Sequence, residues 1–330
     1  MSKRKPMCVQ LTSLLICVSV LRLAGAEKIT TGSPKLEVEM GAQEGPSWNP
    51  FDSSVYFVGR DQVSRLDVQG KVHVFRDKAG GPHGSLVDPQ GRVLVCEGAT
   101  GRRVTRTEKD GSLTVLADNY EGKKLNSPND LSLDSKGRIY FTDPRYGRMD
   151  NMEIRDEAGQ LVEGVYRIDE PGKIVRIITH EVERPNGVLV SPDDRYLYVA
   201  DNYNNRVGGA RKLYRFDLSA NGTIDPSSRK VIFDWHSGRG PDGVKMDQQG
   251  RLYVAAGSNR GSQWESSDEF KGGIYVISPA GELLEFVHFE KDETTNCAFG
   301  GPDLRTLFVT AGSQLWSVQV KTSGRISAKR

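Results

Sequence analysis

Residues 128–141 decide the fold: Pro128-Asn129-Asp130-Leu131-Ser132-Leu133-Asp134-Ser135-Lys136-Gly137-Arg138-Ile139-Tyr140-Phe141. A polar tripeptide opens this stretch, and a short apolar run, a polar turn and a second apolar run follow. The same frame returns at residues 82–95, 185–199 and 241–254, and looser copies begin at Glu44 and Asn296. Each copy predicts two strands joined by a turn, followed by a further strand pair. The chain therefore contains six copies of one unit.

The repeat length selects the architecture. The polar tripeptides recur at intervals of 39 to 57 residues, which suits four strands per unit and is typical of a propeller blade. A solenoid of similar period would need amphipathic helices, and the sequence contains no convincing one. The last unit supplies about three strands, so we expect residues 35–40 to add its outer strand and close the ring. The predicted fold is all-β, a six-bladed β-propeller formed by residues 27–330 as one domain.

Composition excludes several classes of protein. The chain has 330 residues, of which 37% are hydrophobic and 27% are charged, so a disordered chain and a membrane bundle are both disfavoured. Glycine occurs 36 times, more often than average, which indicates many tight turns. The formal net charge is +2, whereas a nucleic-acid-binding protein would show a basic stripe. We therefore expect no nucleic-acid partner.

The first 26 residues have the pattern of a signal peptide. Residues 3–5 are basic, residues 9–21 are mostly apolar, and Ala24-Gly25-Ala26 offers a small-residue cleavage site. The apolar run is shorter than the ~20 residues that a membrane span needs. We therefore expect cleavage, no membrane attachment of the mature chain, and a protein that is exported to the periplasm or secreted.

Two cysteines lie beyond that segment, Cys96 and Cys297. Both stand in apolar runs, so we expect buried free thiols, and a disulfide between them is the alternative.

Each unit places one polar residue at the start of its first strand. These six, here named the slot residues, are Glu44, His83, Asn129, Asn186, Asp242 and Asn296. Any one of the tripeptides alone is an ordinary turn. In a propeller, however, the first strands line the central channel, so the six side chains converge at one end of it. Two converging carboxylates need a cation. Asparagine amides supply the remaining oxygen donors, which favours Ca²⁺ first, then Mg²⁺ or Mn²⁺, with Zn²⁺ the weaker alternative.

Three long connections lie on the same face as the slot residues. They are residues 145–164, 202–212 and 257–272, each expected between the second and third strands of a blade. They carry candidates for substrate contact, namely Arg145, Tyr146, Tyr203, Arg260 and Trp264. Packing against neighbouring loops is the alternative interpretation for each of the aromatic residues.

Part of the sequence resembles a known family. The segments 102–106, 116–118, 120–130 and 140–147 are similar to the gluconolactonase/regucalcin-like metal-dependent lactonases, in particular to microbial extracellular gluconolactonases. The resemblance implies that Glu44, Asn186 and Asp242 are metal ligands and that Asn129 is shared by metal and substrate. It also implies that Asp242 is the acid/base and that His83 is a pocket histidine. Regucalcin-like members carry a sugar-binding Arg two residues before the third slot, where this chain has Ser127.

We therefore expect metal-dependent hydrolysis of a gluconolactone-type sugar lactone to the aldonic acid. The cation would polarise the lactone carbonyl, and Asp242 would act as acid/base, with His83 as the competing base. His83, Asn129 and Asn296 are also expected to contact the small-molecule lactone, and the oligomeric state stays open. The alternatives are a non-catalytic, calcium-braced propeller that binds ligands and a promiscuous lactonase or arylesterase of paraoxonase type.

Overall fold

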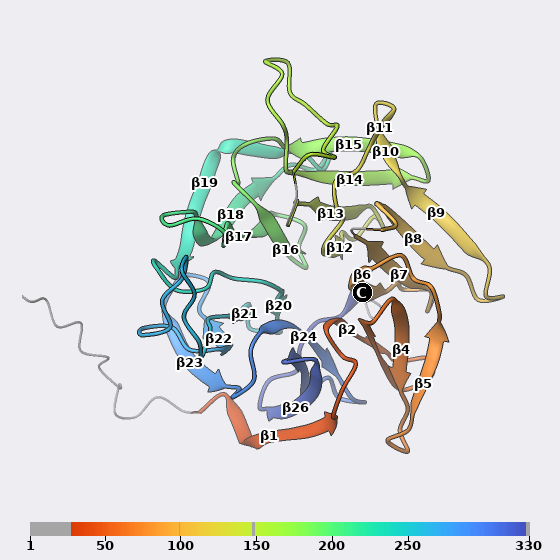
Figure 1. The fold of residues 1–330 in the computed structure, drawn as a ribbon. Coiled ribbons are helices and arrows are strands. Elements are labelled where there is room, and N and C mark those ends of the chain that lie inside the picture. Colours follow the sequence, from red (N-terminus) through yellow and green to blue (C-terminus); the bar gives the residue numbers. More distant parts are fainter. Residues whose placement is uncertain (1–27, 99, 147–148, 328–330) are drawn as a thin grey trace, which may run out of the picture.

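The computed structural model describes residues 28–98, 100–146 and 149–327. Within these residues, six four-stranded sheets stand around a central axis, as Figure 1 shows. The prediction of an all-β, six-bladed propeller is confirmed. No helix of the described part is long and apolar enough to cross a membrane. The expected signal peptide, residues 1–26, lies outside the described residues.

Each blade is an antiparallel sheet, and in the first five blades the strands follow chain order from the axis outward. The first three blades are β2 (Glu44–Asn49), β3 (Ser54–Gly59), β4 (Gln62–Leu66), β5 (Val72–Arg76); β6 (Pro82–Val87), β7 (Val93–Glu97), β8 (Arg103–Thr107), β9 (Leu113–Ala117); and β12 (Leu131–Leu133), β13 (Ile139–Asp143), β14 (Gly164–Glu170), β15 (Lys173–Ile178). The next two are β16 (Pro185–Val190), β17 (Tyr196–Asn202), β18 (Arg211–Leu218), β19 (Ile224–Asp234); and β20 (Val244–Met246), β21 (Leu252–Ala256), β22 (Gly273–Ile277), β23 (Leu283–His288). A small hairpin, β10 (Asn119–Tyr120) and β11 (Lys123–Lys124), connects blades 2 and 3.

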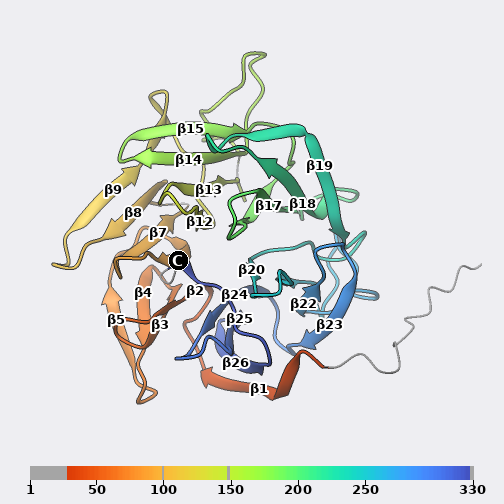
Figure 2. The ribbon, with the colours of Figure 1, turned by 180° about the vertical axis from the view of Figure 1, so that it is seen from behind.

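The sixth blade joins the two ends of the chain. Its strands are β24 (Thr294–Gly300), β25 (Thr306–Ala311), β26 (Gln314–Val320) and, outermost, β1 (Thr30–Val38). β1 pairs antiparallel with β26, from Thr30 opposite Val320 to Val38 opposite Leu315. Figure 2 shows β1 beside β26 at the outer rim of the ring. One sheet thus contains both ends of the domain.

A repeated turn explains why the first two strands of a blade form a hairpin. In blade 3, Asp134 accepts the backbone N–H groups of Lys136 and Arg138, and the Arg138 side chain donates back to the Asp134 carboxylate. Gly137 has a φ of +80°, which favours glycine. The same contacts recur in blades 2 and 5 around Asp88 and Asp247. The sequence pattern Asp-x-x-Gly-Arg therefore encodes a turn held by an ion pair.

Hydrophobic clusters fill the junctions between neighbouring blades. Among the described residues, one cluster occupies each junction around the ring. Between blades 2 and 3, for example, Leu94 packs with Phe141 and Tyr166, and each such buried side chain contributes about 1.5–3 kcal/mol. Both broad faces of each blade are covered, which holds the inner strands around one channel.

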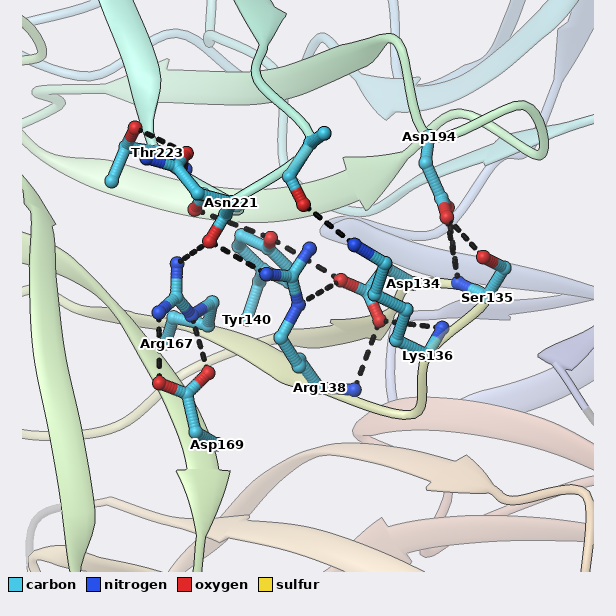
Figure 3. A network of polar contacts seen from close by, with 12 residues as sticks. Asp134, Ser135, Lys136, Arg138, Tyr140, Arg167, Asp169, Asp194, Asn221 and Thr223 are labelled. Carbon is cyan, nitrogen blue, oxygen red and sulfur yellow. Dashed lines mark hydrogen bonds and ion pairs between the residues drawn. The ribbon is translucent and has the colours of Figure 1, made fainter.

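Polar contacts reinforce the junction of blades 3 and 4 at the end of the channel away from the slot residues (Figure 3). The turn between β18 and β19 presents its backbone carbonyl groups to blade 3. The Asn221 carbonyl accepts from Arg138 at 2.6 Å and from Arg167 at 2.7 Å, and the Ala220 carbonyl accepts from Lys136 at 2.6 Å. The basic side chains of one blade thus anchor a turn of the next.

The C-terminal segment enters the channel from this same end. Gly324 forms a bridge with Asp247, and the Arg325 N–H donates to the Met246 carbonyl. Ile326 packs against the clusters on both sides of blade 6. A cavity of about 480 Å³ remains beside this segment, lined by the far ends of the inner strands and by no slot residue. Cys96 and Cys297 are both buried and free, as expected.

Candidate functional site

The six slot residues occupy equivalent positions at one end of the channel. Each lies within the first residues of an inner strand or just before it: Glu44 in β2, His83 in β6, Asn129 before β12, Asn186 in β16, Asp242 before β20 and Asn296 in β24. All except His83 are buried. Since the six blades surround one axis, these side chains approach it from six directions.

Contacts between successive slots close a complete ring. The first slot meets the second where Ser85 Oγ donates to the Gly45 carbonyl, and the second meets the third where the Gly84 N–H donates to the Asn129 carbonyl. Thr142 Oγ1, beside the third slot, donates to the Asn186 carbonyl at 2.6 Å. The sixth slot returns to the first, where Asn296 Nδ2 lies 3.2 Å from Glu44 Oε2.

Glycine allows the remaining two contacts. Gly187 follows Asn186, and a Cβ atom there would lie 2.1 Å from the Asp242 carbonyl oxygen. Gly243 follows Asp242, and a Cβ atom there would lie 2.0 Å from Asn296 Oδ1. Real Cβ atoms do not approach oxygen so closely, so any larger residue would push neighbouring slots apart. The glycine of the tripeptide therefore allows neighbouring slots to approach each other closely, in addition to its part in the turn.

The site concentrates negative charge in a buried place. Burial raises the pKa of Glu44 well above its ordinary value, and repulsion by Asp242 and then Asp130 raises it further. Burial also raises the pKa of Asp242 to about 7, although the Arg239 guanidinium and a hydrogen bond from Asn186 oppose this rise. Glu44 and Asp242 lie close enough to repel each other, so positive charge nearby favours the state in which both are ionised.

The donor set fits a hard divalent cation. Among the described residues, Asn186 Oδ1 is buried without a hydrogen-bond partner, which leaves one amide oxygen open beside the Asp242 carboxylate. Within the same residues, no group of three or more His, Cys, Asp or Glu side chains could hold a metal. Two carboxylates completed by amide oxygens form a different kind of donor set, one that Ca²⁺ accepts. Glu44, Asn129, Asn186 and Asp242 are the residues that could hold it.

His83 faces the third blade. A Cβ atom placed on Gly98 would lie 2.5 Å from His83 Nε2 and 2.8 Å from Ser127 Oγ, so the imidazole and the serine flank the same glycine. Burial lowers the pKa of His83, which keeps the ring neutral at pH 7. A neutral imidazole can accept a proton from water or donate a hydrogen bond to a ligand.

Arg239 is a site residue that the sequence reasoning missed. This buried arginine lies three residues before Asp242, and its Nη2 is 3.0 Å from Asp242 Oδ2 and 2.8 Å from Glu293 Oε2. The ion pair engages one carboxylate oxygen of Asp242. In the sequence, the only sign of this role was an arginine three residues before an acidic slot residue. The other slots have no arginine at that position, so the repeat does not point to it.

Lys245 was missed as well. Its Nζ lies 3.2 Å from Asn296 Oδ1 and 3.8 Å from Asp130 Oδ2. Asn296 Oδ1 also accepts the Cys297 N–H at 2.9 Å. The amide oxygen of Asn296 is therefore engaged away from the site, and its NH₂ group points to Glu44.

The expected rim residues lie in the three long connections between second and third strands, but they differ in their contacts. Tyr146 reaches a slot residue: its hydroxyl oxygen lies 2.8 Å from Asn186 Nδ2. The Tyr203 ring lies instead under the guanidinium groups of Arg184, at 4.1 Å, and Arg206, at 4.5 Å. Its partners are therefore side chains of the protein.

The other three candidates differ in where they lie. Arg145 is buried, and its backbone N–H donates to Glu163 Oε2 at 2.6 Å. Trp264 is 40% exposed, and its carbonyl accepts from Arg211. Arg260 is exposed. Trp264 and Arg260 thus lie on the open rim.

The chain matches known proteins over most of its length. Residues 42–313 match the family model described as SMP-30/Gluconolactonase/LRE-like region. The chain is 32% identical to a protein named gluconolactonase from Zymomonas mobilis subsp. mobilis, over 74% of this chain and 64% of that protein. It is 27% identical to regucalcin from Xenopus laevis, over 86% of this chain and 88% of the relative.

Solved structures show the same likeness. A protein described as a gluconolactonase from Xanthomonas campestris superposes with a TM-score of 0.71 at 28% identity, covering 87% of this chain and 89% of that one. Several named relatives are longer than the matched region, which spans 64% of the Zymomonas protein and 44% of a lactonohydrolase from Aspergillus oryzae.

Proposed function

Because this chain belongs to the SMP-30/gluconolactonase/LRE-like family, we propose that it hydrolyses the ester bond of a sugar lactone to give the aldonic acid. Its substrate is an uncharged small molecule of the gluconolactone type. The cofactor is one divalent cation, Ca²⁺ in the first place, held by Glu44, Asn129, Asn186 and Asp242. The observation that carries the proposal is the closed ring of slots, in which two mutually repelling buried carboxylates stand beside an open amide oxygen.

The chemistry divides between the cofactor and the protein. When bound, a divalent cation polarises a carbonyl oxygen and stabilises the negative charge that develops on it, which contributes several kcal/mol. The protein supplies the proton transfers. The Asp242 carboxylate is suited to take a proton from water and to return it to the departing hydroxyl, the role of a general acid/base within hydrogen-bond reach of the reacting group.

His83 is the competing base. Its lowered pKa keeps it ready to accept a proton, and its position beside Ser127 also suits a hydrogen bond to a lactone hydroxyl. We assign it the second role, orientation of the lactone, because Arg239 fixes one oxygen of Asp242 in place while His83 has no such orienting partner among the described side chains. Ser127 replaces the sugar-binding arginine expected from regucalcin-like members, so the lactone is held here by hydroxyl and amide groups.

Residues 1–26 bear on where the enzyme works. With that segment acting as a signal peptide, the proposal places the mature enzyme in the periplasm or outside the cell.

The test compares lactone hydrolysis in the wild-type chain and in two variants. Acid release from glucono-1,5-lactone should stop with a chelator and return with Ca²⁺ or Mn²⁺. Asp242→Asn should lower kcat by about 10²–10⁴-fold, and His83→Ala should chiefly raise KM. A larger loss of kcat in His83→Ala than in Asp242→Asn would reverse the two roles.

Two controls separate the alternatives. A cation that only braces the fold would lower the melting temperature on chelation by mass action, whereas a catalytic cation should abolish activity with little change in melting. A panel of aldonolactones, aliphatic lactones and aryl esters distinguishes a sugar lactonase from a promiscuous esterase. No hydrolysis of any lactone with the cation present would reject the proposal.

A further inference from the structure

The neighbours of two slot asparagines hold the amide groups in opposite orientations: one presents its NH₂ group to the site and the other presents its oxygen. Asn296 has its oxygen engaged by Lys245 and by the Cys297 N–H, so it turns its NH₂ group to Glu44. Asn186 has its NH₂ group engaged by the Tyr146 hydroxyl at 2.8 Å, and the same NH₂ group also donates to the Asp242 carboxylate. Its oxygen is buried and has no partner within the described residues. The neighbour of each amide thus decides which end is presented to the site.

We propose that Tyr146 is a positioning residue that orients the Asn186 amide so that its oxygen, and not its NH₂ group, faces the cation. This inference rests on the proposed metal site. An asparagine carries one acceptor oxygen and one donor nitrogen, and the wrong orientation would direct N–H groups at a cation. A ligand asparagine therefore needs an outer partner that accepts from its nitrogen.

The surroundings of Tyr146 supply that preference. Its hydroxyl lies 3.4 Å from the Asn202 backbone carbonyl, which can only accept a hydrogen bond. With the hydroxyl proton directed there, the hydroxyl oxygen is left to accept from Asn186 Nδ2. A phenol is protonated at neutral pH, so the hydroxyl has a proton to give to this carbonyl.

Tyr146 comes from the long connection between β13 and β14 in blade 3, whereas Asn186 stands in blade 4. The contact therefore ties a rim loop to a ligand of the next blade. The sequence analysis gave Tyr146 as a candidate for substrate contact; its hydroxyl contact places it behind the proposed ligand Asn186. Outer partners of this kind typically change metal affinity by 10–100-fold.

The test is a cycle of calcium affinities measured by titration calorimetry on full-length, chelator-stripped protein. Tyr146→Phe should weaken Ca²⁺ binding about 10-fold. Asn186→Asp replaces the amide by a carboxylate, whose two equivalent oxygens make orientation irrelevant. In the Asn186→Asp background, adding Tyr146→Phe should change the Ca²⁺ affinity by less than about twofold. A change of that size is within the error found for two substitutions that do not interact.

Asn186→Ala provides a second background in case Asn186→Asp does not fold, and there too Tyr146→Phe should have little further effect. The matched control is Tyr56→Phe, which removes a buried hydroxyl bonded to Asp52 in another blade and should leave the affinity unchanged. Circular dichroism of the metal-free proteins checks that each variant is folded.

The outcomes separate the two proposals. No calcium binding by the wild-type chain would overturn the metal site and this inference together. Binding by the wild type with unchanged affinity in Tyr146→Phe would overturn this inference alone. An equal loss in the wild-type and substituted backgrounds would do the same, since it would mean that Tyr146 supports the fold without orienting the amide.

Discussion

Asp143 and Asp201 are buried carboxylates that hold the chain immediately before two of the slots. Asp143, at the end of β13, accepts the backbone N–H groups of Asn126 and Ser127. Asp201, in β17, does the same for residues 183 and 184. In both blades the two donors stand three and two residues before the slot asparagine. Each carboxylate therefore sets the direction in which a slot enters the channel.

These two residues should make folding depend on pH. Burial raises the pKa of Asp143 and of Asp201 to about 7. The folded state therefore binds more protons than the unfolded state between about pH 4 and pH 7, and the free energy of unfolding falls as the pH rises through that window. We expect each residue to contribute on the order of 1–4 kcal/mol to this fall, measured as urea unfolding at pH 5.5 and pH 8.

The double substitution Asp143→Asn and Asp201→Asn should flatten the profile. Asp225→Asn is the control, because Asp225 is exposed and its pKa is lowered by hydrogen bonds from Ser227. A double variant that keeps the wild-type pH slope would show that other groups carry the dependence.

At this scale, the sequence could identify the slots but not their partners. Glu44 and Asp242 were predictable because their positions recur in the repeated frame. Arg239, Lys245 and the hydroxyl contact of Tyr146 were not. Arg239 lies just before the frame of blade 5, Tyr146 belongs to a rim loop, and Lys245 lies inside the frame but reaches the slot of the next blade. A sequence repeat predicts which residues occupy equivalent backbone positions. An ion pair depends on where the charged ends of two side chains lie in space, which the repeat does not predict.

Among the elements, the turn between the first two strands gives the sharpest expectation. Asp134 is fully buried, accepts two backbone N–H groups and pairs with Arg138, as Figure 3 shows. Blade 4 offers a looser version, in which Asp193 pairs with Arg195 and both side chains are largely exposed. The two turns occupy the same place in adjacent blades, so they form a matched pair.

Asp134→Ala should destabilise the protein by about 2–4 kcal/mol, because it leaves two partly buried N–H groups and Nε of Arg138 without their acceptor. Asp193→Ala should cost less than about 1 kcal/mol, the usual value for an exposed ion pair. Urea unfolding of the two variants beside the wild type measures both. Equal losses would contradict the view that burial gives the turn its strength.

Element boundaries followed from the sequence less completely than element order. The long connections were expected between second and third strands, and all three lie there. The outer strand expected at residues 35–40 overlaps β1, which begins earlier, at Thr30. The hairpin of β10 and β11 was not expected, since two-residue strands show no period of their own.

For the whole molecule, the count of repeats was enough to predict the number of blades. The route of the C-terminal segment was not predictable, because residues 323–327 belong to no repeat and are held mainly by backbone contacts with Met246, Gln248 and Leu304. This segment lies at one end of the channel, whereas the slot residues stand at the other end.

Closure of the ring depends on β1, and removing that strand is the corresponding test. The N–H groups of Ile29 and Thr30 donate to Glu285 in blade 5, and Val38 is buried against blades 6 and 1. Burial of Ile29 and Val38 alone contributes about 3–6 kcal/mol, so deletion of residues 1–38 should lower the melting temperature by on the order of 10 °C relative to deletion of residues 1–26.

The same deletion should disturb the site, because Glu44 follows β1 by six residues and meets Asn296 of the blade that β1 completes. We therefore expect weaker calcium binding as well as a lower melting temperature, measured on the two deletion variants under the same conditions. A truncated chain that melts like its control would mean that blade 6 holds the ring closed with three strands. The slots of blades 1 and 6 would then be held together by their own contacts rather than by the strand that joins the ends of the chain.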